Sequence, residues 1–162
     1  MYLCPMEIQL WCVGKTDRSF WSPAVEEYSK RIQHYIKFSI HFLPEAKAAK
    51  KSLPQQLKND EATRLLQKIK PNDVVILLDE KGKSFSSVAF SKEIEQYMVS
   101  STRRLIFIVG GAFGFSELLY DKFPKRMCLS SMTFSHQMVR LFFCEQLYRA
   151  FTILHNHPYH NN

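Results

Sequence analysis

His136 and Arg140 are the two side chains whose types and spacing best fit chemistry on a bound molecule. A separation of four residues places both on one face of a helix, and the run from about Ser135 to Leu154 has helical spacing. Imidazole moves protons near neutral pH, while a guanidinium and a helix N-terminus both favour anions. The pair predicts a catalytic or anion-holding site, and the alternative is an exposed anion-binding patch.

The chain ends in a second polar pair, Tyr159 and His160, directly after a proline. A phenol beside an imidazole offers hydrogen bonding and proton transfer, although terminal segments are usually frayed and without a role. Glu145 and Arg149 repeat the four-residue spacing inside the predicted helix, and we interpret them as a stabilising ion pair. Tyr159 and His160 are therefore candidate functional residues.

The segment "LSSMTFS" at 129–135 precedes the long helix and contains no glycine and no charge. Small hydroxyl residues mixed with Met and Phe expose backbone N–H and C=O groups beside an apolar wall. Such a loop is suited to hold a ligand.

Strand-like and helix-like segments alternate five times along the chain, which predicts an α/β fold with a mainly parallel sheet and helices on both faces. The length fits one domain over 1–162, in which 1–5 is a possible N-terminal extension. Ser22 is the expected N-cap of the first helix, and 44–56 is an expected mobile loop. The predicted strands are 6–13, 38–43, 73–78, 104–109 and 126–130.

Three loops that follow strands carry unusual residues, and loops at the carboxyl ends of parallel strands bind ligands in open α/β sheets. They are "LLDEKGK" (77–83), "VGGAFGF" (109–115) and "LSSMTFSH" (129–136). Gly110 and Gly111 allow close approach to a ligand or a positive φ, or simply form a tight turn. Asp79 and Glu80 fit either ribose hydroxyls or a turn, and we expect the turn for Glu80.

The net charge of +7 makes nucleic acid the first partner to consider, and a merely solvated surface is the alternative. Four widely spaced cysteines without a CxxC pair indicate neither zinc nor a redox dithiol, so we expect a reduced, cytoplasmic protein that binds no metal. No apolar run is long enough to span a membrane, and the N-terminus lacks the features of a signal peptide.

The segments "LLDEKGK", "FIVGGAFGFS", "LSSMTFSHQMVRLFFCEQLYRAF" and the terminal "PYH", in this order, resemble the ribosomal RNA large subunit methyltransferase H family. This family is a minimal branch of the SPOUT (trefoil-knot) class of S-adenosylmethionine-dependent RNA methyltransferases. The resemblance runs from Met6 to His160 and includes "VGKTD" at 13–17. It implies a five- to six-stranded sheet with a C-terminal trefoil knot.

The resemblance also implies that S-adenosylmethionine lies bent among the three strand-end loops and that no metal is required. Backbone groups of the last loop would read the adenine edge, while apolar side chains wall the pocket. The implied contacts are Leu78, Gly110, Leu129, Ser130, Ser131, Met132, Thr133 and Phe134.

The implied reaction methylates ring N3 of a pseudouridine in a hairpin loop of 23S rRNA on the assembled 70S ribosome. His136, Tyr159 and His160 would shape the target pocket or handle the proton, and Arg140 and Arg149 would hold RNA phosphate or structure. The family forms a homodimer in which one subunit's tail completes the other's pocket. Ser135 replaces a common proline, and the tail ends in two Asn residues instead of a charged pair.

The sequence leaves two other functions open. A SPOUT methyltransferase acting on tRNA would share the donor site but commonly carries an RNA-binding extension. A non-catalytic, ribosome-associated RNA-binding protein would be expected to lose the loop or the tail. A flavodoxin-like nucleotide module is disfavoured, because "VGKTDRS" after the first strand contains only one glycine.

Overall fold

The computed structural model describes residues 6–16, 20–47 and 52–161, so the possible extension at 1–5 lies outside the described residues. The strands are β1 (Glu7–Val13), β2 (Lys37–Leu43), β3 (Val74–Ser84), β4 (Arg104–Val109) and β5 (Arg126–Cys128). The helices are α1 (Trp21–Gln33), α2 (Pro54–Lys68), α3 (Ser87–Val99), α4 (Glu117–Lys122) and α5 (His136–Leu154).

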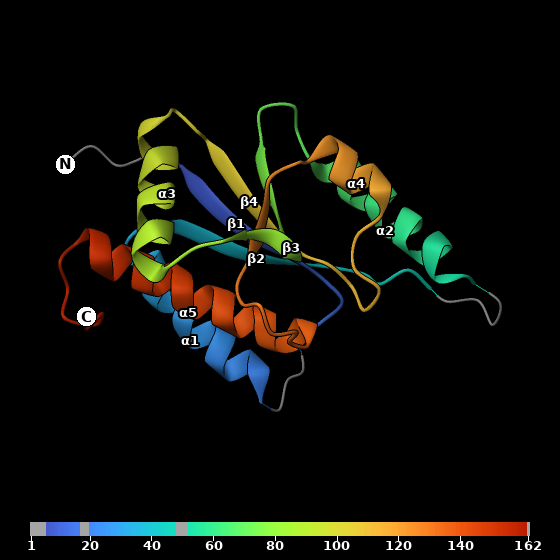
Figure 1. Ribbon diagram of the computed structural model, residues 1–162. Coiled ribbons are helices and arrows are strands. Elements are labelled where there is room, and N and C mark those ends of the chain that lie inside the picture. The colour runs from blue at the N-terminus through green and yellow to red at the C-terminus, as the bar shows by residue number, and fades with distance from the viewer. Residues whose placement is uncertain (1–5, 17–19, 48–51, 162) are drawn as a thin grey trace.

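The five strands form one sheet in the order β2-β1-β4-β3-β5, and every neighbouring pair is parallel. Helices α1, α3 and α5 cover one face, and α2 and α4 cover the other (Figure 1). The predicted α/β architecture is therefore confirmed. The threading of the chain that would make a trefoil knot stays a prediction.

Side chains of β4 show how the sheet builds two cores. Leu105, Phe107 and Val109 pack in the cluster under α1, α3 and α5, while Ile106 and Ile108 pack in the cluster under α2 and α4. Alternate residues of a strand point to opposite faces, so a strand covered on both sides must be apolar throughout. This is why "RLIFIV" reads as a continuous hydrophobic run.

Helix α5 runs along the sheet between α1 and α3 (Figure 1). The predicted start is confirmed, because the Ser135 hydroxyl caps the helix and accepts a hydrogen bond from the Met138 amide at 3.4 Å. Four apolar residues of the helix are only half-buried: Met138, Leu141, Phe142 and Tyr148. The fully buried stripe is Arg140, Phe143, Cys144, Leu147, Ala150 and Phe151.

Other local predictions also need correction. Helix α1 begins at Trp21 with Phe20 at the N-cap position, so Ser22 lies in the first turn, where its hydroxyl donates to Glu26 at 3.0 Å. The expected loop at 44–56 is shorter than predicted, because α2 begins at Pro54; residues 48–51 lie outside the described residues. Strand β5 ends at Cys128, two residues early.

Strand β3 continues six residues past its predicted end at Leu78. Leu78 and Lys83 both lie opposite Met127 of β5, so the four residues between them bulge out of the ladder. Asp79 stabilises the turn in this bulge, because its carboxylate accepts a hydrogen bond from the Lys81 amide at 2.7 Å. Gly82 closes it against β5, where a Cβ would lie 2.5 Å from the Met127 nitrogen.

We predict that Gly82→Ala destabilises the fold by roughly 1–3 kcal/mol, because the added methyl overlaps backbone atoms that cannot move without breaking the β3–β5 ladder. Chemical denaturation would measure the change. The neighbouring, exposed Ser84→Ala is the matched control and should change the free energy of unfolding by less than about 0.5 kcal/mol. Equal stabilities for the two variants would show that the bulge tolerates a side chain.

Candidate functional site

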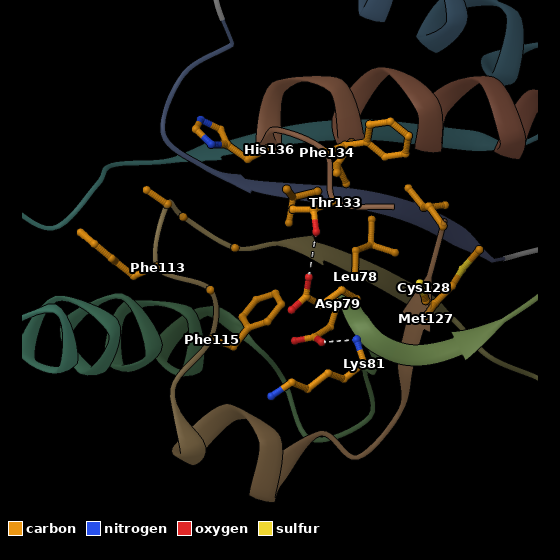
Figure 2. Close-up of a pocket in the computed structure, with 18 of the residues that line it drawn as sticks. Leu78, Asp79, Lys81, Phe113, Phe115, Met127, Cys128, Thr133, Phe134 and His136 are labelled. Atoms are coloured by element: carbon orange, nitrogen blue, oxygen red, sulfur yellow. Dashed lines mark hydrogen bonds between the residues drawn. The ribbon is translucent and has the colours of Figure 1, made fainter. Parts of the chain in front are cut away.

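A cavity of about 620 Å³ opens where β3, β4 and β5 end. Its walls are the β3 bulge, the loop after β4, the loop after β5 and the first turn of α5 (Figure 2). The three strand-end loops that sequence analysis singled out therefore meet around one space. They meet because parallel neighbouring strands end at the same edge of a sheet.

The β3 bulge is tied to two other walls of the cavity. The Tyr120 hydroxyl of α4 donates to the Asp79 carboxylate, and burial together with that carboxylate raises the pKa of Tyr120. The Thr133 hydroxyl donates to Glu80 across the cavity at 3.3 Å (Figure 2). The expectation that Glu80 forms the turn was therefore wrong. Asp79 forms it, and Glu80 links the bulge to the loop after β5.

The loop after β4 approaches its neighbours closely at two glycines. A Cβ on Gly110 would lie 3.2 Å from the Phe115 ring, and a Cβ on Gly111 would lie 3.0 Å from the Glu61 carboxylate of α2. Positive φ occurs at Gly114 instead, with a hydrogen bond from its amide to the Gly111 carbonyl at 3.1 Å. Positive φ is therefore wrong for Gly110 and Gly111. Both lie close to neighbouring side chains, and Gly111 begins the tight turn that ends at Gly114. Close approach of either glycine to a ligand stays a prediction.

The loop after β5 is braced by its own polar groups. The Met132 amide donates to the Ser130 hydroxyl at 3.0 Å, and the Cys128 thiol donates to the Ser130 carbonyl at 2.8 Å. The Phe134 ring packs edge-on against Phe142 of α5, with centroids 5.0 Å apart. Seven of the eight predicted donor contacts line the cavity, and Ser131 is the exception.

His136, the first residue of α5, stands at the rim of this cavity. Burial lowers the pKa of its imidazole, and the positive charge of Arg140 lowers it further; the Glu45 carboxylate acts in the opposite direction. The imidazole is thereby held in its neutral form near pH 7, in which one ring nitrogen accepts a proton.

Arg140 does not lie on the surface with His136. Its guanidinium is fully buried and donates to the Val13 carbonyl at 2.6 Å and to the Thr16 hydroxyl at 3.1 Å. An exposed anion-binding patch made by His136 and Arg140 is therefore wrong. The contacts of Arg140 fix the loop after β1 to α5, a role that helical spacing alone could not reveal.

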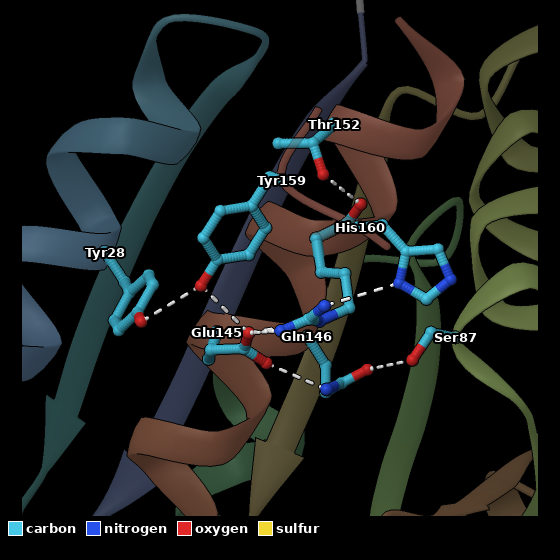
Figure 3. Close-up of polar contacts among 8 residues, drawn as sticks. Tyr28, Ser87, Glu145, Gln146, Thr152, Tyr159 and His160 are labelled. Atoms are coloured by element: carbon cyan, nitrogen blue, oxygen red, sulfur yellow. Dashed lines mark hydrogen bonds and ion pairs between the residues drawn. The ribbon is translucent and has the colours of Figure 1, made fainter. Parts of the chain in front are cut away.

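The tail folds back on the second half of α5 (Figure 3). The Tyr159 hydroxyl lies 3.0 Å from Glu145 and 3.2 Å from the hydroxyl of Tyr28 on α1, and His160 Nδ1 lies 3.3 Å from Arg149. The predicted ion pair between Glu145 and Arg149 is confirmed at 2.5 Å. Sequence reasoning missed Tyr28, because nothing local to it signals a contact with the tail.

The tail and the cavity of one chain are separate. Glu145 and Arg149 follow His136 by nine and thirteen residues, which places them roughly 14–20 Å from it along the helix axis. Among the described residues there is no cluster of three or more His, Cys, Asp or Glu side chains suited to a metal, and no helix long and apolar enough to cross a membrane.

Residues 6–160 match the family described as "Predicted SPOUT methyltransferase". The chain therefore belongs to the SPOUT methyltransferase family. Within it, the chain is 50% identical over 156 residues to the Ribosomal RNA large subunit methyltransferase H of Christiangramia forsetii, covering 96% of this chain and 99% of that protein. The proteins of the same name from Flavobacterium johnsoniae and Porphyromonas gingivalis (strain ATCC 33277) are 49% and 44% identical over the same shares.

Among solved structures, a probable methylase family protein from Haemophilus influenzae Rd KW20 superposes with a TM-score of 0.49 and 10% identity. The alignment covers 94% of this chain and 67% of that one. So loose a superposition adds nothing to the family assignment, which follows from the sequence matches over nearly the full chain.

We predict that His136 titrates below about 6.5, the ordinary midpoint of an unfolded-chain histidine, because burial and Arg140 disfavour the imidazolium. The neutral imidazole therefore contributes to the stability of the fold at pH values above about 6.5. This contribution is lost as the pH falls from there through the lower pKa of His136 in the folded protein. An NMR pH titration of the imidazole resonances measures the midpoint. Glu45→Gln should lower it further, and a midpoint at or above 6.5 would contradict the proposed environment.

Proposed function

We propose that this rRNA methyltransferase transfers a methyl group from S-adenosylmethionine to ring N3 of a pseudouridine in a 23S rRNA hairpin loop, on the assembled 70S ribosome. The observation that carries the proposal is the meeting of the three strand-end loops around one cavity that seven of the eight expected donor contacts line. The relatives' name supports ribosomal RNA of the large subunit as the substrate.

The cavity fits the methyl donor in size and in chemistry. Its volume lies within the range of about 300–1,000 Å³ typical of small-molecule sites. Leu78, Met132 and Phe134 supply apolar walls, Gly110 permits close approach, and the backbone of 129–134 offers the polar groups that an adenine edge requires. Bound S-adenosylmethionine supplies an electrophilic methyl group on its sulfonium.

His136 is our candidate for the group that accepts the N3 proton. It lines the cavity from the first turn of α5, whereas the two tail residues Tyr159 and His160 contact Glu145 and Arg149 on the second half of that helix. A neutral imidazole at the rim is ready to take a proton from a weakly acidic ring nitrogen. Arg140 is a positioning residue, because it holds the loop after β1 against α5 one turn beyond His136.

A homodimer accounts for the distance between the tail and the cavity of one chain. We propose that Tyr159 and His160 of one subunit complete the target pocket of the other. Half-buried Leu141 and Phe142 on α5, together with Met132, which is 71% exposed beside the cavity, offer apolar surface for such an interface. Because its substrate is the ribosome, we place the enzyme in the cytoplasm.

Methyl transfer to defined RNAs tests the proposal. The full chain is incubated with S-adenosylmethionine carrying a labelled methyl group and with 70S ribosomes, isolated large subunits or total tRNA, each from a strain that lacks this methylation. We expect label in 23S rRNA of 70S particles only. Label in tRNA would establish the rival SPOUT activity, and donor binding without transfer to any of the three RNAs would favour a binding role.

We predict that Gly110→Val weakens S-adenosylmethionine binding by at least about tenfold, because Gly110 lines the cavity and the added side chain would take space that we assign to the donor. Isothermal titration calorimetry measures the affinity. Since the valine also presses on the Phe115 ring, Gly110→Val/Phe115→Leu is the control: it relieves that contact and should still bind weakly. Wild-type affinity in Gly110→Val would refute the placement.

A further inference from the structure

Ion pairs and aromatic rings both order cations among the described residues, and Arg31, Arg104 and Arg149 make contacts of both kinds. Arg31, Lys37, Arg104 and Arg149 each form an ion pair with a carboxylate. Lys83, Lys125 and Arg126 are instead held by aromatic rings, and within the described residues none of the three has a carboxylate at ion-pair distance. An aromatic ring orders a cation without neutralising its charge, so these three charges remain available to a partner.

The ring contacts are specific. The Lys83 ammonium lies 4.7 Å from the centroid of Phe85, and the Lys125 ammonium lies 5.0 Å from that of Tyr97, to whose hydroxyl it also donates at 3.2 Å. The Arg126 guanidinium lies 4.9 Å from the centroid of Tyr120. Phe85 follows β3, Tyr97 belongs to α3 and Tyr120 belongs to α4.

All three cations lie at one edge of the sheet. Strand β5 is the last strand in the sheet order, and Lys83 stands opposite Met127, the residue after Arg126. Lys125 lies beside α3 on one face, and Arg126 lies beside α4 on the other, so the charges straddle the free edge of β5. We call this set of Lys83, Lys125 and Arg126 the β5 edge.

The β5 edge is continuous with the cavity. Met127 and Cys128 of β5 line the cavity, as does Tyr120, the ring that holds Arg126. Exposed Lys81, on the bulge next to the edge, also lines it (Figure 2). A chain that places one nucleotide in the cavity therefore passes close to the β5 edge.

Nearby carboxylates do not cancel these charges. Glu93 raises the pKa of Tyr97, and Glu117 raises the pKa of Tyr120. Within the described residues neither carboxylate forms an ion pair with Lys83, Lys125 or Arg126. Asp79 is engaged by the Tyr120 hydroxyl and the Lys81 amide. Within the described residues the β5 edge thus presents positive charge that no ion pair neutralises, beside the cavity, and this charge complements a polyanion.

We propose that the β5 edge binds the phosphate backbone of the RNA that flanks the nucleotide entering the cavity. The proposal rests on the proposed function and assigns to that same site the surface that holds its substrate. Lysine and arginine nitrogens contact phosphate oxygens and position the RNA without reading its sequence. Because the aromatic rings already restrict these long side chains, the side chains lose less conformational entropy when they bind phosphate.

The test measures kcat/KM for 70S ribosomes against salt concentration in Lys83→Gln/Lys125→Gln/Arg126→Gln. We expect kcat/KM to fall at least about tenfold near physiological salt, and the salt dependence to lose roughly two to three units of slope, because each phosphate contact contributes about one. S-adenosylmethionine affinity should stay within about twofold of wild type, since the three side chains do not line the cavity.

The matched control removes two lysines and one arginine at the amino ends of β3 and β4, in Lys68→Gln/Lys70→Gln/Arg103→Gln. These exposed residues precede β3 and β4, away from the cavity. The charge-preserving variant Lys83→Arg/Lys125→Arg/Arg126→Lys should keep the wild-type slope, and thermal melting of each variant separates lost binding from lost folding.

The proposal is overturned if the β5-edge variant, folded and binding the donor, has the same slope and kcat/KM as the control variant. That result leaves the proposed function intact, because wild type would still methylate 70S ribosomes. Failure of the proposed function gives a different result: wild type itself transfers no label to 70S ribosomes while it binds S-adenosylmethionine.

Discussion

Parallel pairing of β5 with β3, rather than with β4, is the constraint on which the cavity depends. Because β5 lies beyond β3, the chain that leaves β5 must pass the carboxyl ends of β3 and β4 to reach α5. The loop at 129–135 is thereby placed against the bulge of β3, where Thr133 meets Glu80. A β5 on the other side of the sheet would leave the three loops on different parts of the edge.

Helix α5 connects this cavity to the rest of the molecule. Its first turn carries His136 at the rim, and one turn later buried Arg140 binds Val13 and Thr16 after β1. A buried guanidinium costs much free energy when its N–H groups lack acceptors. Here the Val13 carbonyl and the Thr16 hydroxyl accept from the two terminal nitrogens, whereas Nε has no hydrogen-bond partner within the described residues. The position of His136 is thus set by the sheet, through a contact that has no access to solvent.

Electrostatic roles differ between the two halves of the molecule. On the second half of α5, Glu145 forms an ion pair with Arg149 and accepts a hydrogen bond from the Tyr159 hydroxyl. These charged groups hold the tail against the helix. At the β5 edge, aromatic rings hold Lys83 and Arg126 without removing their charge. The net charge of +7 alone could not distinguish these uses, since both kinds of residue count equally in it.

The sequence by itself determined the alternation of strands and helices, the capped start of α5 at Ser135, the three strand-end loops that line the cavity and the family. These features have local causes: apolar periodicity, a side chain that caps a helix, and residues that permit or prevent particular backbone conformations. Only the tertiary structure decided that β3 bulges against β5, that Arg140 is buried and that the tail docks on Tyr28. Each of these features depends on contacts between segments far apart in the chain. A local sequence pattern does not identify the distant residues that make such contacts, so it could not predict them.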